Sequence, residues 1–211
     1  MRIRRIYNGF AAGLLAIGLL LGGPVNAQTI LALGDSLTAG YGLGPGESFP
    51  DQLQAALAEA GRDVNVINAG VSGDTTAGGK GRLGWLISGD KPDVVVVELG
   101  ANDGLRAIDP ASTKANLADI IEQAQAVGAV VLLAGMYAPP NLGAGYADTF
   151  NAVFPSLAET YGVVYYPFFL EGVAGDLSLN QADGIHPTAE GIGIVVDNIL
   201  PSVIEALERA K

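Results

Sequence analysis

The sequence predicts a doubly wound α/β fold, in which helices cover both faces of a parallel sheet. Three observations predict it: five short apolar runs, the lack of polar alternation within these runs, and helical patterns between them. Continuous apolar runs are typical of strands buried on both faces, and alternation with helices is typical of parallel strands joined by helical crossovers. With 211 residues, 49% of them hydrophobic, the chain is long enough to form one such domain.

The five predicted strands follow one another along the chain, each bounded by turn residues. The first, at 29–33, is a short apolar run that ends at Gly34. The second and third are rich in β-branched residues, which favour strands. The second to fifth strands are expected at 64–67, 94–97, 130–134 and 163–166.

Three segments between or after these strands have apolar residues at helical spacing. The first has them at positions 49, 53, 56, 57 and 60 and ends before Gly61, a residue common just after a helix. The second starts at Asp109-Pro110, a pair typical of an N-cap and first helical residue, and ends before Gly128. The third lies near the C-terminus and has its apolar residues at positions 192, 195, 196, 199, 203, 204 and 207.

The composition excludes several classes of function. The chain has no cysteine and one histidine, which excludes disulfides, thiol nucleophiles, Cys-based zinc or iron sites and any metal site that needs two imidazoles. A formal net charge of −11 argues against a nucleic-acid partner or an anionic membrane surface. Gly79-x-Gly81-x-x-Gly84 fits a dinucleotide-binding pattern but does not directly follow a strand, so we interpret it as a flexible turn or helix start. We therefore expect no metal and no cofactor.

Residues 1–27 are predicted to be a secretory signal peptide. A head with three arginines precedes an apolar run at 10–21 and a small-residue cleavage sequence that ends at Ala27. The apolar run is too short for a membrane-spanning helix, which needs about 20 residues. We expect cleavage after Ala27, which would leave one domain at 28–211 with a formal net charge of −14. This domain is expected to be periplasmic or secreted, monomeric and not inserted in a membrane.

Reactive residue types follow three predicted strands and precede the last helix. Gly34-Asp35-Ser36-Leu37 follows the first strand, a turn with Gly73 follows the second, and Asn102 follows the third. Asp183 and His186 come before the last helix. Because ligands of such sheets bind outside the carboxyl ends of the strands, we expect one crevice to gather these residues. Acyl transfer needs this set: a nucleophile, a base, an acid that orients the base, and donors for the oxyanion.

Each residue also has a structural interpretation when it is taken alone. Ser36 would cap a helix, His186 would be a surface residue, and Asn102 would form a turn. The three-residue spacing, however, lets Asp183 accept from Nδ1 of His186 and leaves Nε2 facing the nucleophile. The chain order of Ser36, Asp183 and His186 matches that of α/β-hydrolases, although position 38 is threonine, so the Gly-x-Ser-x-Gly elbow is absent. The backbone N–H groups of Ser36 and Gly73 and the amide of Asn102 are candidate oxyanion donors.

Taken together, these segments resemble the GDSL/SGNH hydrolase family over essentially the whole chain after residue 27. The resemblance rests on four blocks in the family's order: Gly34-Asp35-Ser36-Leu37, Gly73, Gly100-Ala101-Asn102-Asp103 and Asp183-x-x-His186. Segments 72–75, 97–106 and 167–169 look like the secreted acyl-CoA thioesterases, lysophospholipases and arylesterases of that family.

The resemblance implies a flavodoxin-like three-layer α/β/α sandwich with a five-stranded parallel sheet, the SGNH hydrolase fold. It implies that Ser36 is the nucleophile, His186 the base and Asp183 the orienting acid. It also assigns the oxyanion hole to Ser36, Gly73 and Asn102. The loop at 136–146, with Pro139, Pro140 and Asn141, corresponds to the segment that lines the acyl-binding groove.

We therefore expect a metal-independent serine hydrolase that acts on a small-molecule ester or acyl substrate through an acyl-enzyme. The expected substrates are aryl esters, esters of short or medium acyl chains, and lysophospholipids, with acyl thioesters as a further capability. Acyl-CoA is polyanionic and cytoplasmic, which fits an acidic, exported chain less well. Two alternatives stay open: a carbohydrate acetylesterase, and a non-catalytic ligand-binding module on the same scaffold.

Overall fold

The computed structural model describes residues 27–89 and 91–211, so the predicted signal peptide lies outside the described residues except for Ala27. Its five strands form one parallel sheet in the order β2-β1-β3-β4-β5. The strands are β1 (Gln28–Gly34), β2 (Val64–Gly70), β3 (Val94–Glu98), β4 (Val130–Ala134) and β5 (Val164–Tyr166). This order is flavodoxin-like, and the predicted fold class and all five strands are confirmed.

The strand register brings three chain segments level at the carboxyl edge of the sheet. Gly34 at the end of β1 pairs with Gly70 of β2 on one side and with Glu98 of β3 on the other. The strand order reverses at β1, because β2 lies on one side of it and β3 on the other. Such a switch point opens a crevice beyond the strand ends, which is where the reactive residues were expected.

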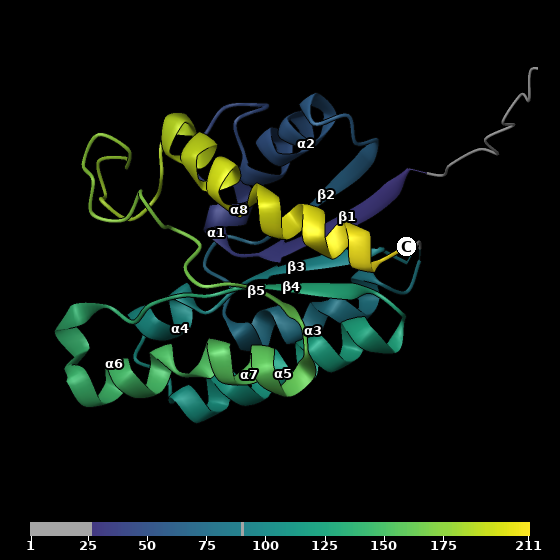
Figure 1. Cartoon of the computed structure of the whole chain (residues 1–211). Coiled ribbons are helices and arrows are strands. Elements are labelled where there is room, and N and C mark those ends of the chain that lie inside the picture. The colour runs from purple at the N-terminus through teal and green to yellow at the C-terminus, as the bar shows by residue number, and fades with distance from the viewer. Residues whose placement is uncertain (1–26, 90) are drawn as a thin grey trace, which may run out of the picture.

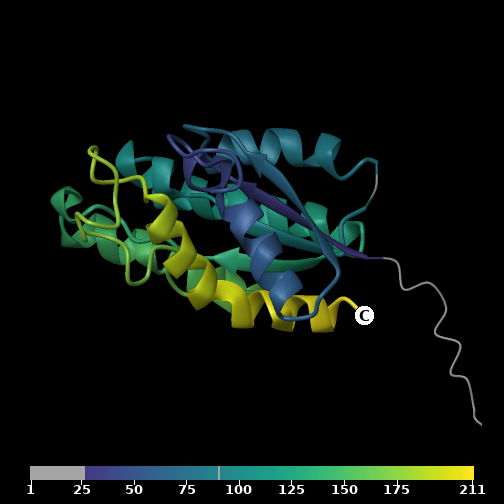
Figure 2. The ribbon, with the colours of Figure 1, turned by 90° about the horizontal axis from the view of Figure 1, so that it is seen from above.

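Helices cover both faces of the sheet (Figure 1). Helices α2 (Phe49–Glu59) and α8 (Ala189–Arg209) pack together on one face, as the view from above also shows (Figure 2). Helices α3 (Thr76–Leu86), α5 (Pro110–Ala126) and α7 (Val153–Tyr161) cover the other face. The short elements α1 (Ser36–Ala39), α4 (Ala101–Leu105), η1 (Pro140–Leu142) and α6 (Ala144–Asn151) follow the carboxyl ends of the strands.

Each of the three predicted helices combines an N-cap residue with an apolar face that packs into the core. Ser48 caps α2 by accepting from the N–H of Asp51, and Asp109 caps α5 by accepting from the N–H of Ala111. The apolar positions predicted for α8 lie mostly in the core, and the helix continues through Pro201. Each fully buried leucine or isoleucine stabilises the fold by about 1.5–3 kcal/mol relative to exposure. Within residues 27–89 and 91–211, we find no helix long and apolar enough to cross a membrane.

The glycine repeat at 79–84 lies inside helix α3, which begins at Thr76, so of the two interpretations the helical one holds and the flexible turn is wrong. Thr75 caps this helix by accepting from the N–H of Gly78. A Cβ on Gly79 would overlap the side chain of buried Leu99, so the missing side chain lets α3 approach the segment after β3 closely. The repeat therefore serves helix packing in this fold.

Candidate active site

Ser36 lies at a sharp turn from β1 into the one-turn helix α1. Asp35 caps α1, its Oδ1 accepting from the N–H of Leu37 at 3.0 Å. A Cβ on Gly34 would overlap the hydroxyl of Thr38, so only glycine allows the turn to close this tightly. This turn places Ser36 at the carboxyl edge without the Gly-x-Ser-x-Gly elbow.

The structure brings Ser36, His186 and Asp183 into one hydrogen-bonded chain. Nε2 of His186 lies 2.9 Å from Oγ of Ser36, and Nδ1 lies 2.7 Å from Oδ2 of Asp183. The other carboxylate oxygen of Asp183 accepts from the N–H groups of Ile185 and His186, each at 3.1 Å. The hydrogen bond from His186, followed by the two backbone N–H groups, lowers the pKa of Asp183 to about 2. Asp183 is therefore ionised near neutral pH and favours the tautomer of His186 that carries its proton on Nδ1.

The predicted oxyanion donors line one cavity together with Ser36. Gly73 and Asn102 both border it, Gly73 from the loop after β2 and Asn102 from the short helix α4 after β3. Gly73 has a φ of +80°, and its carbonyl accepts from Nη2 of Arg106 at 2.8 Å. Nδ2 of Asn102 donates to Oδ2 of Asp35 at 2.9 Å, which fixes the amide plane beside Ser36.

The cavity has a volume of about 600 Å³ and is largely apolar. Pro139 and Pro140 line it, whereas exposed Asn141 lies outside its lining. Tyr137 and Phe168 stack beside each other in its wall, with ring centroids 4.4 Å apart. Its apolar wall is made of Leu37, Leu105, Met136, Tyr137, Phe168, Leu170 and Ile185.

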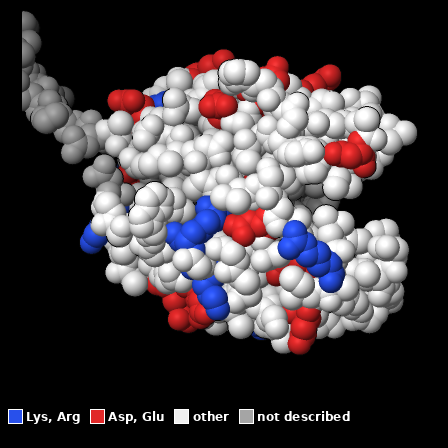
Figure 3. Space-filling view, turned by 180° about the vertical axis from the view of Figure 1, so that it is seen from behind, with Lys and Arg blue, Asp and Glu red and all other residues white. Residues whose placement is uncertain are grey.

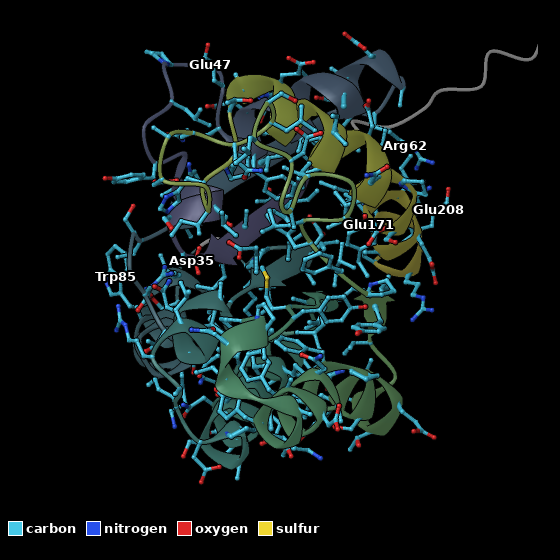
Figure 4. The ribbon with its side chains drawn as sticks, turned by 90° about the vertical axis from the view of Figure 1, so that its left-hand side faces the viewer. Asp35, Glu47, Arg62, Trp85, Glu171 and Glu208 are labelled. Atoms are coloured by element: carbon cyan, nitrogen blue, oxygen red, sulfur yellow. The ribbon has the colours of Figure 1, made fainter. Side chains whose placement is uncertain are left out.

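Two buried carboxyl groups lie beneath the Ser36 turn. Burial raises the pKa of Asp35 to about 6, against the opposing effect of its hydrogen bonds from Leu37 and Asn102. Glu98 is fully buried, and burial together with the charge of Asp35 raises its pKa well above the usual value. Seen from the carboxyl edge, Asp35 lies between the two helical layers, while Trp85 points outward (Figure 4). Sequence reasoning missed Glu98, although a carboxyl group at the end of the apolar run of β3 could have signalled it.

Arg82 of α3 is a second supporting residue that sequence reasoning missed. Its guanidinium donates to the carbonyls of Gly34 and Ala69, at 2.9 and 2.6 Å, and to the carboxylate of Asp74 at 2.8 Å. It thereby joins the ends of β1 and β2 to the loop that carries Gly73. Within the described residues, we find no group of three or more His, Asp or Glu side chains arranged to hold a metal ion.

A flavodoxin-like sheet with serine, imidazole and carboxylate in one hydrogen-bonded chain at its carboxyl edge defines the class of SGNH-type serine hydrolases. Comparison with known proteins agrees with this class. The chain belongs to the GDSL-like lipase/acylhydrolase family, whose sequence model matches residues 32–193.

Relatives of this family are similar over most of their length. The chain is 44% identical over 192 residues to "Esterase TesA" of Pseudomonas aeruginosa, covering 91% of this chain and 95% of that protein. It is 38% identical over 171 residues to "Thioesterase 1/protease 1/lysophospholipase L1" of Escherichia coli K12, covering 81% of each. The crystal structure of AlinE4, a SGNH-hydrolase family esterase, is 48% identical with a TM-score of 0.73, covering 86% of this chain and 97% of that one. The chain is accordingly an ester hydrolase of the GDSL type.

Proposed function

We propose that the chain cleaves carboxylic esters through an acyl-enzyme formed on Ser36. The observation that carries this proposal is the hydrogen-bonded chain from Ser36 through His186 to Asp183. In the first half-reaction, Oγ of Ser36 attacks the ester carbonyl while Nε2 of His186 takes its proton. The imidazolium then returns this proton to the departing alkoxide, and Asp183 stays ionised and stabilises the positive charge. In the second half-reaction, water repeats the attack on the acyl-enzyme and releases the acid.

The oxyanion of each tetrahedral intermediate needs donors fixed in advance. We assign them to the N–H groups of Ser36 and Gly73 and to the amide of Asn102. Asp35 supports this assignment because it accepts one N–H of the Asn102 amide and so sets the direction of the other. A single such donor contributes about 100- to 1000-fold to the rate.

The cavity favours a substrate whose acyl or aryl group is apolar and uncharged. Its lining contains no lysine or arginine, and each acyl CH₂ buried against its apolar wall would contribute about 0.8 kcal/mol to binding. On the face seen from behind, acidic side chains are scattered, and the basic side chains form separate groups near the middle with acidic ones between them (Figure 3). We therefore propose short- or medium-chain esters, aryl esters and lysophospholipids as substrates, with acyl thioesters as a secondary class. A carbohydrate acetylesterase is a weaker candidate, since the likeness to a Clostridium thermocellum family 3 carbohydrate esterase, at 23% identity, shows the fold alone.

Labelling with a fluorophosphonate, followed by peptide mapping, tests the nucleophile. The folded protein should form a single adduct on Ser36, and Ser36→Ala should form none. A folded wild-type protein without an adduct would favour the non-catalytic alternative.

Replacing the base tests the rest of the mechanism. His186→Ala should lower kcat for an aryl ester by roughly 10,000-fold or more, since it removes the proton acceptor for Ser36. EDTA should leave the wild-type rate unchanged. Turnover near the wild-type rate in His186→Ala would contradict the imidazole mechanism.

We further propose that residues 1–27 form a cleaved signal peptide and that the domain at 28–211 is an exported monomer. The fold supports the position of the cut, because β1 begins at Gln28, directly after Ala27.

A further inference from the structure

An aromatic ring lies against the imidazole of His186. The ring centroids of Tyr41 and His186 are 4.5 Å apart, and their planes are inclined by 38°. Tyr41 lines the cavity and is 53% exposed, so its ring is not held there by burial. The position of the ring beside His186 therefore depends on how the backbone of Tyr41 is held.

Gln181 ties Tyr41 to the His186 loop. Its Nε2 donates to the carbonyl of Tyr41 at 2.7 Å and to the carbonyl of Pro187 at 2.9 Å. The backbone N–H of Gln181 donates to the carbonyl of His186 at 2.7 Å. One side chain thus joins two loops that are 140 residues apart in sequence.

The segment around Tyr41 has a backbone shaped for this contact. Gly40 and Gly42 have φ values of +80° and +74°, a region that favours glycine. A Cβ on Gly42 would overlap the amide oxygen of Gln181. The N–H of Tyr41 donates to the carbonyl of Ser36 at 3.1 Å, which connects the ring to the nucleophile turn.

We propose that Tyr41, held by Gln181, is a positioning residue for His186 and stabilises the imidazolium that forms when Ser36 gives up its proton. This inference rests on the proposed function of Ser36 and His186. A cation within about 6 Å of an aromatic centroid is attracted by the face of the ring, and the observed separation lies within this range. At a partly exposed site, losing this attraction should slow the reaction of Ser36 about two- to fivefold. His186 would also lose the ring that holds its imidazole in place, which should slow the reaction further.

Two variants distinguish the contribution of the aromatic ring from other contributions of Tyr41. Tyr41→Phe removes only the hydroxyl, whereas Tyr41→Leu removes the ring and keeps an apolar side chain. Phe keeps the face and should keep kcat within about twofold, whereas Leu should lower kcat about tenfold and change KM less. The rate of Ser36 labelling by a small fluorophosphonate should fall in parallel with kcat, because it reports activation of the nucleophile. Gln181→Glu, which has the same shape but no N–H to donate, should lower both rates in the same direction.

Tyr137→Leu provides the matched comparison. Tyr137 is 52% exposed in the same cavity but stacks on Phe168, so its replacement should act more on KM than on kcat. Thermal unfolding should show that each variant is folded. Tyr41→Leu with wild-type kcat and labelling rate, in a protein that still labels on Ser36, would overturn this inference alone. Wild-type protein that fails to label would instead overturn the proposed function on which it rests.

Discussion

At the scale of single residues, Glu98 combines full burial with incomplete hydrogen bonding. Its Oε2 accepts from the hydroxyl of Thr38 at 2.7 Å and from the N–H of Asp35 at 3.3 Å. Its Oε1 is buried without a hydrogen-bond partner among the described residues. The carboxyl of Asp35 lies close by, so ionising both groups in this low-dielectric site is unfavourable. The neutral acid is therefore the form in which Glu98 best supports the Ser36 turn.

The raised pKa of Glu98 makes the stability of the folded protein depend on pH. A carboxyl whose pKa is raised in the folded state binds its proton more tightly there than in the unfolded chain. Its contribution to stability is therefore complete at low pH and is lost as pH rises through the folded pKa. Glu98→Gln keeps an acceptor for Thr38 and Asp35 but does not ionise.

We expect the Tm of Glu98→Gln to exceed that of wild type by an amount that grows as pH rises above the ordinary pKa of a glutamate, because burial and the charge of Asp35 raise the pKa of Glu98 in the folded protein. Asp35, whose pKa is about 6, can ionise in both proteins, and in wild type its charge adds to the cost of ionising Glu98. Thermal unfolding followed by circular dichroism measures both curves. Curves that stay parallel as pH rises would mean that Glu98 ionises normally in the folded protein.

The residues of the candidate site differ in how far sequence predicts them. Asp183 and His186 were predicted because a spacing of three residues lets the carboxylate reach Nδ1, and because the pair is one of the four blocks that resemble the family. Glu98, Arg82 and the Gln181 contact to Tyr41 were not, because their partners lie far away in sequence. Asn141 was named only through the loop it belongs to, and the turn of η1 leaves it outside the cavity lining.

At the scale of elements, helix α3 shows where sequence patterns stop being informative. The strands were predictable because their apolar runs are continuous, and α2, α5 and α8 because their apolar faces are regular. Four glycines weaken the helical pattern of α3, and α4 is a five-residue turn that begins after Gly100 at a φ of +121°. These helices form because tertiary contacts, including the bonds of Arg82 to two strand ends, outweigh their poor local propensity.

Gly79 and Gly81 of α3 should respond in opposite ways to alanine. A Cβ on Gly81 has no heavy atom within 4 Å, so Gly81→Ala should stabilise the protein by about 0.5–1 kcal/mol through helix propensity. In Gly79→Ala, either α3 or the buried side chain of Leu99 must shift, which should destabilise the protein by about 1–3 kcal/mol. Denaturant unfolding of the two variants measures both values. Equal gains in stability would show that α3 does not pack closely on the segment after β3.

At the scale of the whole molecule, the position at which β1 begins can be compared with the predicted cleavage site after Ala27. β1 is an interior strand that pairs with β2 from Gln28 onward and with β3 from Ile30 onward. The side-chain amide of Gln28 donates to the carbonyl of Leu207, and the N–H of Thr29 donates to the carboxylate of Asp93. A cut after Ala27 leaves all of these contacts in place, whereas a cut a few residues later removes part of the central sheet.

We therefore expect export of the full chain to yield one product that begins at Gln28. Its intact mass should be that of residues 28–211, and light scattering should show a single chain in solution. The product should keep full esterase activity, because the reactive residues and both strands beside β1 lie within it. A product that keeps residues 1–27 would contradict the predicted leader. A product that begins within β1 should be unfolded, because it lacks part of the central strand that precedes Ser36.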